Sequence, residues 1–227
     1  MNRHRLYRLM VAFVVLALSR QSHAADYSDP KKTLRTFWEA IKADDVASIK
    51  ACMTVSDGNK SAMLDFVTDT WIVPHQCAKA AAAKFGKVPD YFQHDCPEDK
   101  DLDEALVRLG TSRVRIARDR ALVELNNSDG ELIGAPLSDG AIPLRKIGAE
   151  WKIDIDLVVG IDDPAATMRK ADVMVPVHKG MKQILAGISS GKFHGPEEVD
   201  KAVSAEFNAA YRDHPTSERR TKSDARP

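Results

Sequence analysis

The chain has 227 residues, and its 33 basic and 33 acidic side chains give a formal net charge of zero. Four of the arginines lie within the first 24 residues, so the rest of the chain carries 29 basic against 33 acidic side chains, a net charge of about −4. This balance argues against nucleic-acid binding, which needs a clustered basic surface.

Residues 1–24 are predicted to be a cleavable secretory signal peptide. The basic start MNRHRLYR leads into the apolar run LMVAFVVLAL, and a small-x-small site follows at Ser22 and Ala24. A membrane-spanning helix needs about 20 apolar residues, roughly twice the length of this run. We therefore expect cleavage after Ala24, export to the periplasm or the extracellular space, and no stable membrane insertion of the mature chain. An uncleaved signal anchor is the alternative.

The first half of the mature chain is predicted to be helical. A capping carboxylate and a first-turn proline at Asp29-Pro30 begin a helix whose apolar face consists of Leu34, Phe37, Trp38 and Ile41. Asp44 or Asp45 begins a second, short helix, and its residues Val46, Ile49 and Cys52 are expected to face the core. Further helices are predicted at residues 61–73, in the alanine-rich stretch CAKAAAAKF and in the charged segment 101–109.

The mature chain holds three cysteines, and three thiols cannot all pair within one chain. Cys52 continues the apolar stripe of the second helix, so we expect it to be a buried thiol. Cys77 and Cys96 flank a turn-rich stretch with Gly86 and Pro89, and Pro97 follows it; a bridge there would close a short loop. We therefore predict a disulfide between Cys77 and Cys96.

After the charged helix, the hydrophobic period changes to two. The stretches SRVRIA and RALVEL alternate around a corner at Arg118-Asp119, and AIPLRKI and EWKIDIDL alternate around Gly148-Ala149. These patterns predict four strands in two hairpins. The period becomes helical again over residues 164–186 and 196–211, and residues 213–227 are expected to form a disordered tail.

Helices followed by an antiparallel meander indicate an α+β fold. The helical segment DPKKTLRTFWEAIKADDVASIKACM, the hairpin SRVRIARDRALVEL and the closing pair IPLRKIGAEWKIDI resemble the nuclear-transport-factor-two-like superfamily. This cystatin-like α+β group includes ketosteroid isomerases, SnoaL-type polyketide cyclases and non-catalytic secreted modules. The resemblance covers Asp29 to Leu157 and implies a cone-shaped domain over 25–158, with N-terminal helices on a curved antiparallel sheet of about four strands. Residues 159–212 then form a C-terminal helical extension.

The resemblance also implies a pocket between the helices and one face of the sheet. Strand alternation puts Trp151 and Ile153 on the core-facing side, and Lys152, Asp154 and Asp156 on the other. The candidates for lining the pocket are Trp38, Trp71, Trp151 and Ile153. Their alternative role is simple core packing.

Catalysis of the isomerase kind needs a carboxylate inside the pocket. The core-facing strand positions carry no carboxylate, and Lys146, near a strand end, is their one ionisable residue. The remaining candidates for catalysis are Tyr91, His94 and Asp95, in the segment before the strands. A solvated polar loop is the alternative reading of these three residues.

No metal site and no cofactor are expected. The most acidic stretch lacks the glycine and glutamate of a calcium loop, so a solvated face is predicted for Asp154, Asp156, Asp162 and Asp163. The histidines form neither a helical ligand pair nor an HExxH motif. The segment from Gly187 to Gly191 matches the serine-hydrolase pattern GxSxG, but it follows a helical stretch and is predicted to be a glycine-capped helix end.

Three functions are compatible with these features. The first is an exported, non-catalytic domain that binds a small apolar ligand or a partner protein through the pocket or the exposed sheet face. The second is an enzyme of the isomerase or cyclase kind that uses residues 91–95. The third is a dimer-forming structural module without a ligand, in which the C-terminal helices supply or block the sheet surface.

Overall fold

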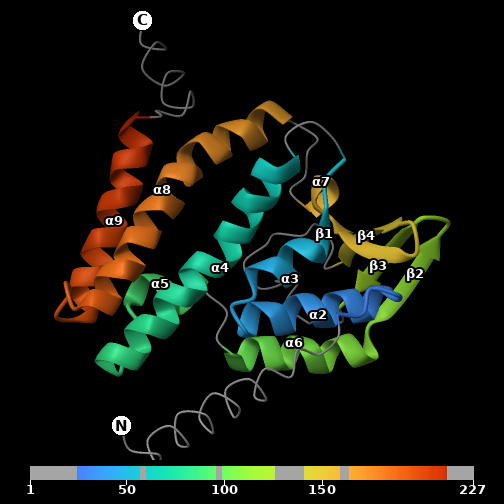
Figure 1. Cartoon of the computed structure of the whole chain (residues 1–227), viewed down its shortest axis with the longest axis horizontal. Helices are drawn as coiled ribbons and strands as arrows, with labels where there is room; N and C mark the ends of the chain where they lie inside the picture. Colours follow the sequence, from blue (N-terminus) through green and yellow to red (C-terminus); the bar gives the residue numbers. More distant parts are fainter. Residues whose placement is uncertain (1–24, 57–59, 96–98, 126–140, 159–163, 214–227) are drawn as a thin grey trace, which may run out of the picture.

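The computed structural model describes residues 25–56, 60–95, 99–125, 141–158 and 164–213. They form an α+β fold in which helices pack on a five-stranded mixed sheet (Figure 1). The sheet lies at one end of the molecule with α2, α3 and α6, and the long helix α4 leads to α5, α8 and α9 at the other end. The predicted α+β class is thus confirmed, whereas the expected curved antiparallel sheet of about four strands is a five-stranded mixed sheet.

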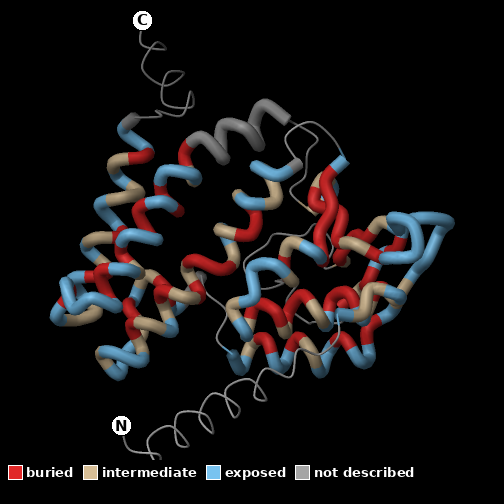
Figure 2. The backbone as a smooth tube through the Cα atoms, viewed as in Figure 1, coloured by how far each residue is buried: buried red, intermediate tan, exposed pale blue. Residues whose placement is uncertain are grey.

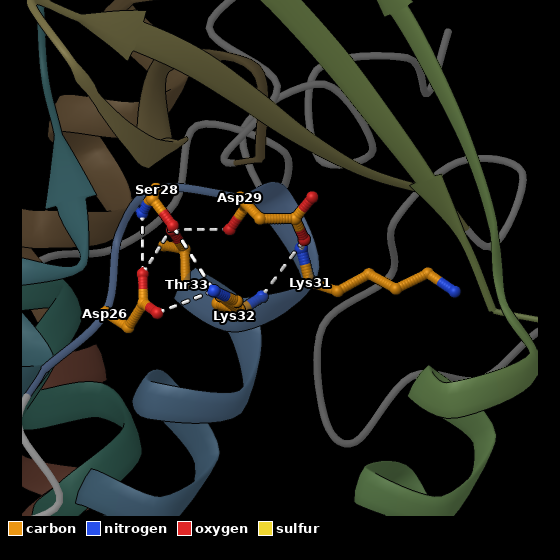
Figure 3. A network of polar contacts seen from close by, with 6 residues as sticks. All are labelled: Asp26, Ser28, Asp29, Lys31, Lys32 and Thr33. Carbon is orange, nitrogen blue, oxygen red and sulfur yellow. Dashed lines mark hydrogen bonds and ion pairs between the residues drawn. The ribbon is translucent and has the colours of Figure 1, made fainter.

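Helix α2, Pro30–Lys42, begins as its sequence predicts. The Asp29 carboxylate accepts a hydrogen bond from the backbone N–H of Lys31 at 2.8 Å, and Asp26 forms an ion pair of 2.8 Å with the Lys32 ammonium (Figure 3). The Thr33 hydroxyl donates to the carbonyl of Trp151 at 3.0 Å, which ties this helix start to the sheet. The predicted apolar face is buried, and it includes Leu34, Phe37, Trp38 and Ile41.

The next segment departs from the prediction in two ways. Helix α3, Val46–Ala51, begins after Asp45 and buries Ile49, but Val46 is exposed. The short strand β1, Met53–Thr54, follows Cys52 and pairs in parallel with the last strand, Met53 lying opposite Ile153. Two residues are too short a run for a period-two pattern, so the sequence offered no strand signal here.

Helix α4, Lys60–Phe85, is one element where the sequence suggested two. It continues through Pro74, although proline has no N–H to donate to the preceding turn. The prediction that Cys77 forms a disulfide with Cys96 is wrong. Cys77 is a free, buried thiol inside α4, and its Sγ donates to the carbonyl of Met181 at 3.6 Å; Cys96 lies outside the described residues. None of the described helices combines the length and apolar character that a membrane crossing needs.

Two further helices, α5 (Asp90–Asp95) and α6 (Asp99–Thr111), precede the sheet. Its antiparallel strands are β2 (Arg113–Ala117), β3 (Arg120–Glu124), β4 (Ala141–Ile147) and β5 (Glu150–Asp154). The strand order is β1-β5-β4-β3-β2, so both predicted hairpins are present and β1 makes the sheet mixed. The sheet is neither closed nor strongly curled.

The inner face of the sheet packs against α2, which in turn packs against α6. Side chains from three strands are buried there: Ala121, Val123, Ile142, Leu144, Trp151 and Ile153. Buried residues also follow α4 and α8 where these two helices meet (Figure 2). The core therefore continues from the sheet into the helical end of the molecule.

The C-terminal extension is helical, as predicted, and consists of α8 (Pro164–Ser190) and α9 (Pro196–Asp213). Helix α8 packs on α4 and α9, and α9 packs on α5. Gly191 has a φ of +86° and ends α8, and the Lys192 N–H donates to the Gly187 carbonyl at 2.9 Å. The GxSxG segment is thus a capped helix end, as predicted, and Ser189 only donates to the Leu185 carbonyl one turn earlier.

Candidate functional site

The residues predicted to line a pocket are mostly core residues. Trp38, Trp151 and Ile153 are at most 4% exposed and belong to the core between α2 and the sheet. Trp71 is half-buried, and its ring meets that of Phe37 edge to face at a centroid distance of 6.0 Å. Their side chains therefore pack the fold, which is the alternative role stated for them above.

Tyr91 is the catalytic candidate whose side chain the structure describes, and it lies away from the sheet hairpins. Tyr91 is on α5, its ring centroid is 5.4 Å from that of Phe207 on α9, and its backbone N–H donates to Asp200 at 2.9 Å. Figure 1 shows α5 beside α9 at the helical end of the molecule. His94 and Asp95 end the same helix, and their side chains lie outside the described residues. The fold brings Tyr91 to α9 rather than to the sheet.

The most distinctive chemistry lies on the sheet face that points away from α2, which we call the outer face. It carries alternate residues of the strands: Arg113, Arg115, Arg120, Leu122, Glu124, Arg145, Lys152 and Asp154. One half, at β4 and β5, is covered and internally paired. The other half, the β2–β3 hairpin, is exposed.

The covered half of the outer face contains a buried ion pair. Asp154 is 0% exposed, and its Oδ2 accepts from Arg145 Nε at 2.9 Å and from Nη2 at 2.6 Å. Arg145 also donates to the Ser56 hydroxyl at 2.9 Å, and Asp156 accepts from the Ser56 N–H at 2.8 Å. Asp154 Oδ1 has no hydrogen-bond partner. The network joins β4, β5, the segment after β1 and helix α7, Ile155–Val158.

The predicted solvated acidic face is therefore wrong for Asp154. Its strand parity was assigned correctly, but α7 packs against β1, β4 and β5 and encloses that end of the outer face. Asp156 belongs to α7 rather than to the strand, and Asp162 and Asp163 lie outside the described residues. Among the residues that the structure describes, no three His, Cys, Asp or Glu side chains are grouped to hold a metal ion.

Lysines of β4 and β5 also form contacts, Lys152 on the outer face and Lys146 on the inner face. Lys152 lies 3.8 Å from the centroid of the Tyr27 ring and 2.7 Å from the Glu150 carboxylate. Lys146, the ionisable residue expected among the core-facing positions, is exposed at the strand end, with its ammonium 5.7 Å from the centroid of the Trp151 ring. The covered half of the outer face thus balances most of its own charges.

Among the residues that the structure describes, the exposed half of the outer face carries more positive than negative charge. The strand register places Arg113 opposite Glu124, but Glu124 forms its ion pair with Arg115. Two arginines of this face therefore adjoin a single described carboxylate. Arg120 lies directly opposite Arg145, which turns toward Asp154. Like charges in directly opposed strand positions destabilise a sheet. The hairpin therefore keeps an excess of positive charge that does not help the fold.

The same hairpin exposes apolar side chains and a free strand edge. Ile116 is 58% exposed and Leu122 is 43% exposed. Strand β2 ends the sheet, and β3 is its one strand partner among the described residues. Figure 2 shows this hairpin as an exposed projection beyond the helices. The alternating arginines were visible in RVRIARDR, but their position at the sheet edge was not.

A second polar cluster joins elements in the middle of the molecule. His75 of α4 is buried, with Nδ1 3.2 Å from Asp44 Oδ1 and Nε2 3.5 Å from Asp99 Oδ1. Burial raises the pKa of Asp44, but the hydrogen bond from His75 and the charge of Lys79 outweigh it and hold this pKa below its usual value. The cluster connects α4 to the turn after α2 and to the start of α6, which indicates a structural role.

Comparison with known proteins finds no match to a protein family, to a curated protein or to a solved structure. The resemblance to the nuclear-transport-factor-two-like superfamily therefore stays a prediction. The chain is an α+β protein whose β2–β3 hairpin exposes Arg113, Arg115 and Arg120.

Proposed function

We propose that this is an exported, non-catalytic binding module that recognises a partner protein through its β2–β3 hairpin. The observation that carries the proposal is the unbalanced set of arginines on the exposed half of the outer face, in a mature chain that is acidic overall. Export rests on the signal peptide predicted for residues 1–24.

A nuclear-transport-factor-two-like fold is part of this proposal. The order of helices and hairpins supports it, and so do the N-terminal helices on one face of the sheet. The added parallel strand and the weak curl of the sheet depart from the expected cone. A binding module of this superfamily, rather than one of its enzymes, is the variant that the chemistry of the hairpin favours.

A partner protein fits the exposed surface better than a small apolar ligand does. The aromatic residues suggested for an apolar pocket are mostly buried in the core, whereas the hairpin offers arginines and aliphatic side chains to the outside. Arginine is enriched at the centres of protein interfaces. The two thiols that the structure describes offer no nucleophile either, because burial raises the pKa of Cys52 and of Cys77 to about 12.

Site-specific photo-crosslinking tests this proposal. A benzoylphenylalanine replaces Leu122 on the hairpin, or Val107 on α6 as a control at a more exposed position. After mixing with exported proteins, we expect one partner to crosslink from position 122 and not from position 107. The variant Arg120→Glu should lose most of this crosslink, while Arg35→Glu, the same charge change on the exposed side of α2, should keep it. Equal crosslinking from both positions, or none from position 122, contradicts the proposal.

A further inference from the structure

We propose that the segment recognised is an extended acidic strand that adds to the sheet beside β2. Its acidic side chains would lie on the outer face next to Arg113 and Arg115, and its apolar side chains on the inner face next to Val114 and Ile116. This inference rests on the proposed function for the choice of surface, and it specifies the chemistry of the partner.

The backbone of β2 supplies the first step of the argument. An edge strand leaves alternate N–H and C=O groups without a partner in the sheet, and an extended peptide can satisfy them by continuing the ladder. Strand β2 ends the sheet and has only β3 as its strand partner within the described part of the chain. Its residues Arg115, Ile116 and Ala117 are all exposed.

The side chains of β2 supply the second step. Arg113 and Arg115 lie on one face of the strand, and Val114 and Ile116 lie on the other. A strand docked beside β2 would place its own alternate residues next to these two sets. Opposite charges in such cross-strand positions are favourable, and so are aliphatic pairs. The matching segment therefore alternates acidic and aliphatic residues.

The same pattern argues against a second copy of this chain as the occupant. Antiparallel pairing of β2 with β2 of another molecule would set arginines beside arginines on the outer face. Parallel pairing through the same edge would turn the second sheet over and set its arginines beside Val114 and Ile116. Glu124, the carboxylate opposite Arg113, lies one strand further in and is already paired with Arg115. A membrane or a nucleic acid would supply negative charge, but neither offers a backbone that extends the ladder.

The direct test uses a defined peptide with the blocked sequence Thr-Glu-Val-Glu-Ile-Glu-Thr. Two control peptides accompany it: one with lysine in place of each glutamate, and one with the same sequence but N-methyl groups on alternate residues of the ladder-forming edge. Isothermal titration should show binding of the first peptide and at least about tenfold weaker binding of both controls, since one lacks the charges and the other lacks the donors.

Charge reversal in the protein provides a second, independent readout. The variant Arg113→Glu/Arg115→Glu should prefer the lysine peptide, whereas Arg35→Glu should keep the wild-type preference. If the double variant does not fold, hydrogen exchange on the wild-type protein replaces it. Addition of the glutamate peptide should then slow exchange of amide protons in β2 and leave those of α6 unchanged.

Each contrary result identifies what is wrong. Equal affinity for the N-methylated peptide contradicts strand addition. Arginine-dependent binding to phosphatidylglycerol vesicles, without binding of the peptide, would assign the surface to an anionic membrane instead. If no peptide binds while position 122 still crosslinks one partner, the strand model is wrong and the proposed function stands. If neither experiment succeeds, both are wrong.

Discussion

Asp154 carries a buried charge, and Arg145 is the side chain that balances it. Arg145 contacts Asp154 Oδ2 through Nε at 2.9 Å and Nη2 at 2.6 Å, and Asp154 is 0% exposed. A buried pair of this kind adds little net stability compared with an apolar pair, but removing one partner leaves an uncompensated charge in the interior. The stability of the protein should therefore be sensitive to removal of either partner of this pair.

The variant Arg145→Met should lower the free energy of unfolding by about 3 kcal/mol, because it leaves Asp154 without its counter-ion. Urea unfolding measures this. The double variant Arg145→Met/Asp154→Asn should recover a large part of the loss, since the buried charge is then absent. A loss in the double variant as large as in the single one would show that the guanidinium acts through packing rather than through charge.

The two described cysteines should be inert in the native protein. Burial raises the pKa of Cys52 and of Cys77 to about 12, so almost no thiolate is present near neutral pH. We expect iodoacetamide to leave both residues unlabelled in the native state at pH 8 and to label both after unfolding without a reductant. Labelling of the native protein would contradict the burial of these thiols. Labelling of unfolded Cys77 only after addition of a reductant would indicate a disulfide with Cys96.

At the scale of elements, α8 depends on close contact with the loop that follows it. A Cβ added to Gly187 would lie 2.7 Å from the ring of Phe193, a buried residue, whereas a Cβ added to Gly110 of α6 would meet nothing within 4 Å. Two glycines in helices thus have opposite environments. Gly187 is needed because a side chain has no space there, whereas Gly110 is only a weak helix former.

Gly187→Ala should therefore destabilise the protein by about 1–3 kcal/mol, because the Phe193 ring has to move. Gly110→Ala should be neutral or stabilising by up to about 1 kcal/mol, because alanine favours the helix. Thermal unfolding of both variants checks the pair. A neutral Gly187→Ala would mean that the ring has room to rotate away.

The β2–β3 hairpin should show a conflict between stability and binding. Arg120 lies opposite Arg145, so Arg120→Glu removes a repulsive pair and should raise stability by about 0.5 kcal/mol or leave it unchanged. The same variant should lose the crosslink from position 122. A clear loss of stability in Arg120→Glu would show that this arginine serves the fold, which would weaken the case for a binding surface.

At the scale of the whole molecule, α4 links the sheet end to the helical end through its contact with α8. His178 of α8 lies in that contact, buried beside Phe66 at a ring centroid distance of 5.6 Å, with Nδ1 lacking a hydrogen-bond partner. Burial lowers the pKa of His178; the Asp69 carboxylate opposes this shift, and the Lys182 ammonium adds to it. Asp69 and Lys182 form an ion pair of 2.6 Å beside it.

Acid should therefore loosen the junction between the two ends. Below its ordinary pKa of 6.5, His178 takes up a proton more readily in the unfolded chain than in the folded one, so stability falls as the pH falls through this range. Melting temperatures measured from neutral pH down to about pH 5 should fall more in the wild type than in His178→Met. Parallel curves for the two proteins would rule out His178 as the titrating group.

The sequence by itself determined the α+β class, the capped start of α2, the two hairpins and the helical C-terminal extension. Each of these follows from local signals: a capping carboxylate, a period of two or of 3.6, and a glycine with positive φ. The sequence also shows the alternating arginines of the candidate site. Periodicity assigned even Asp154 to the correct face of its strand.

Only the tertiary structure decided which face is covered and which strand is free. The pairing of β1 with β5 and the packing of α7 bury Asp154, and the same sheet order leaves β2 at the edge of the sheet that the structure describes. Cys77 points to Met181, which is 104 residues away, rather than to a nearby cysteine. These outcomes depend on contacts between segments far apart in the chain, and a local pattern carries no information about which distant segment will cover it.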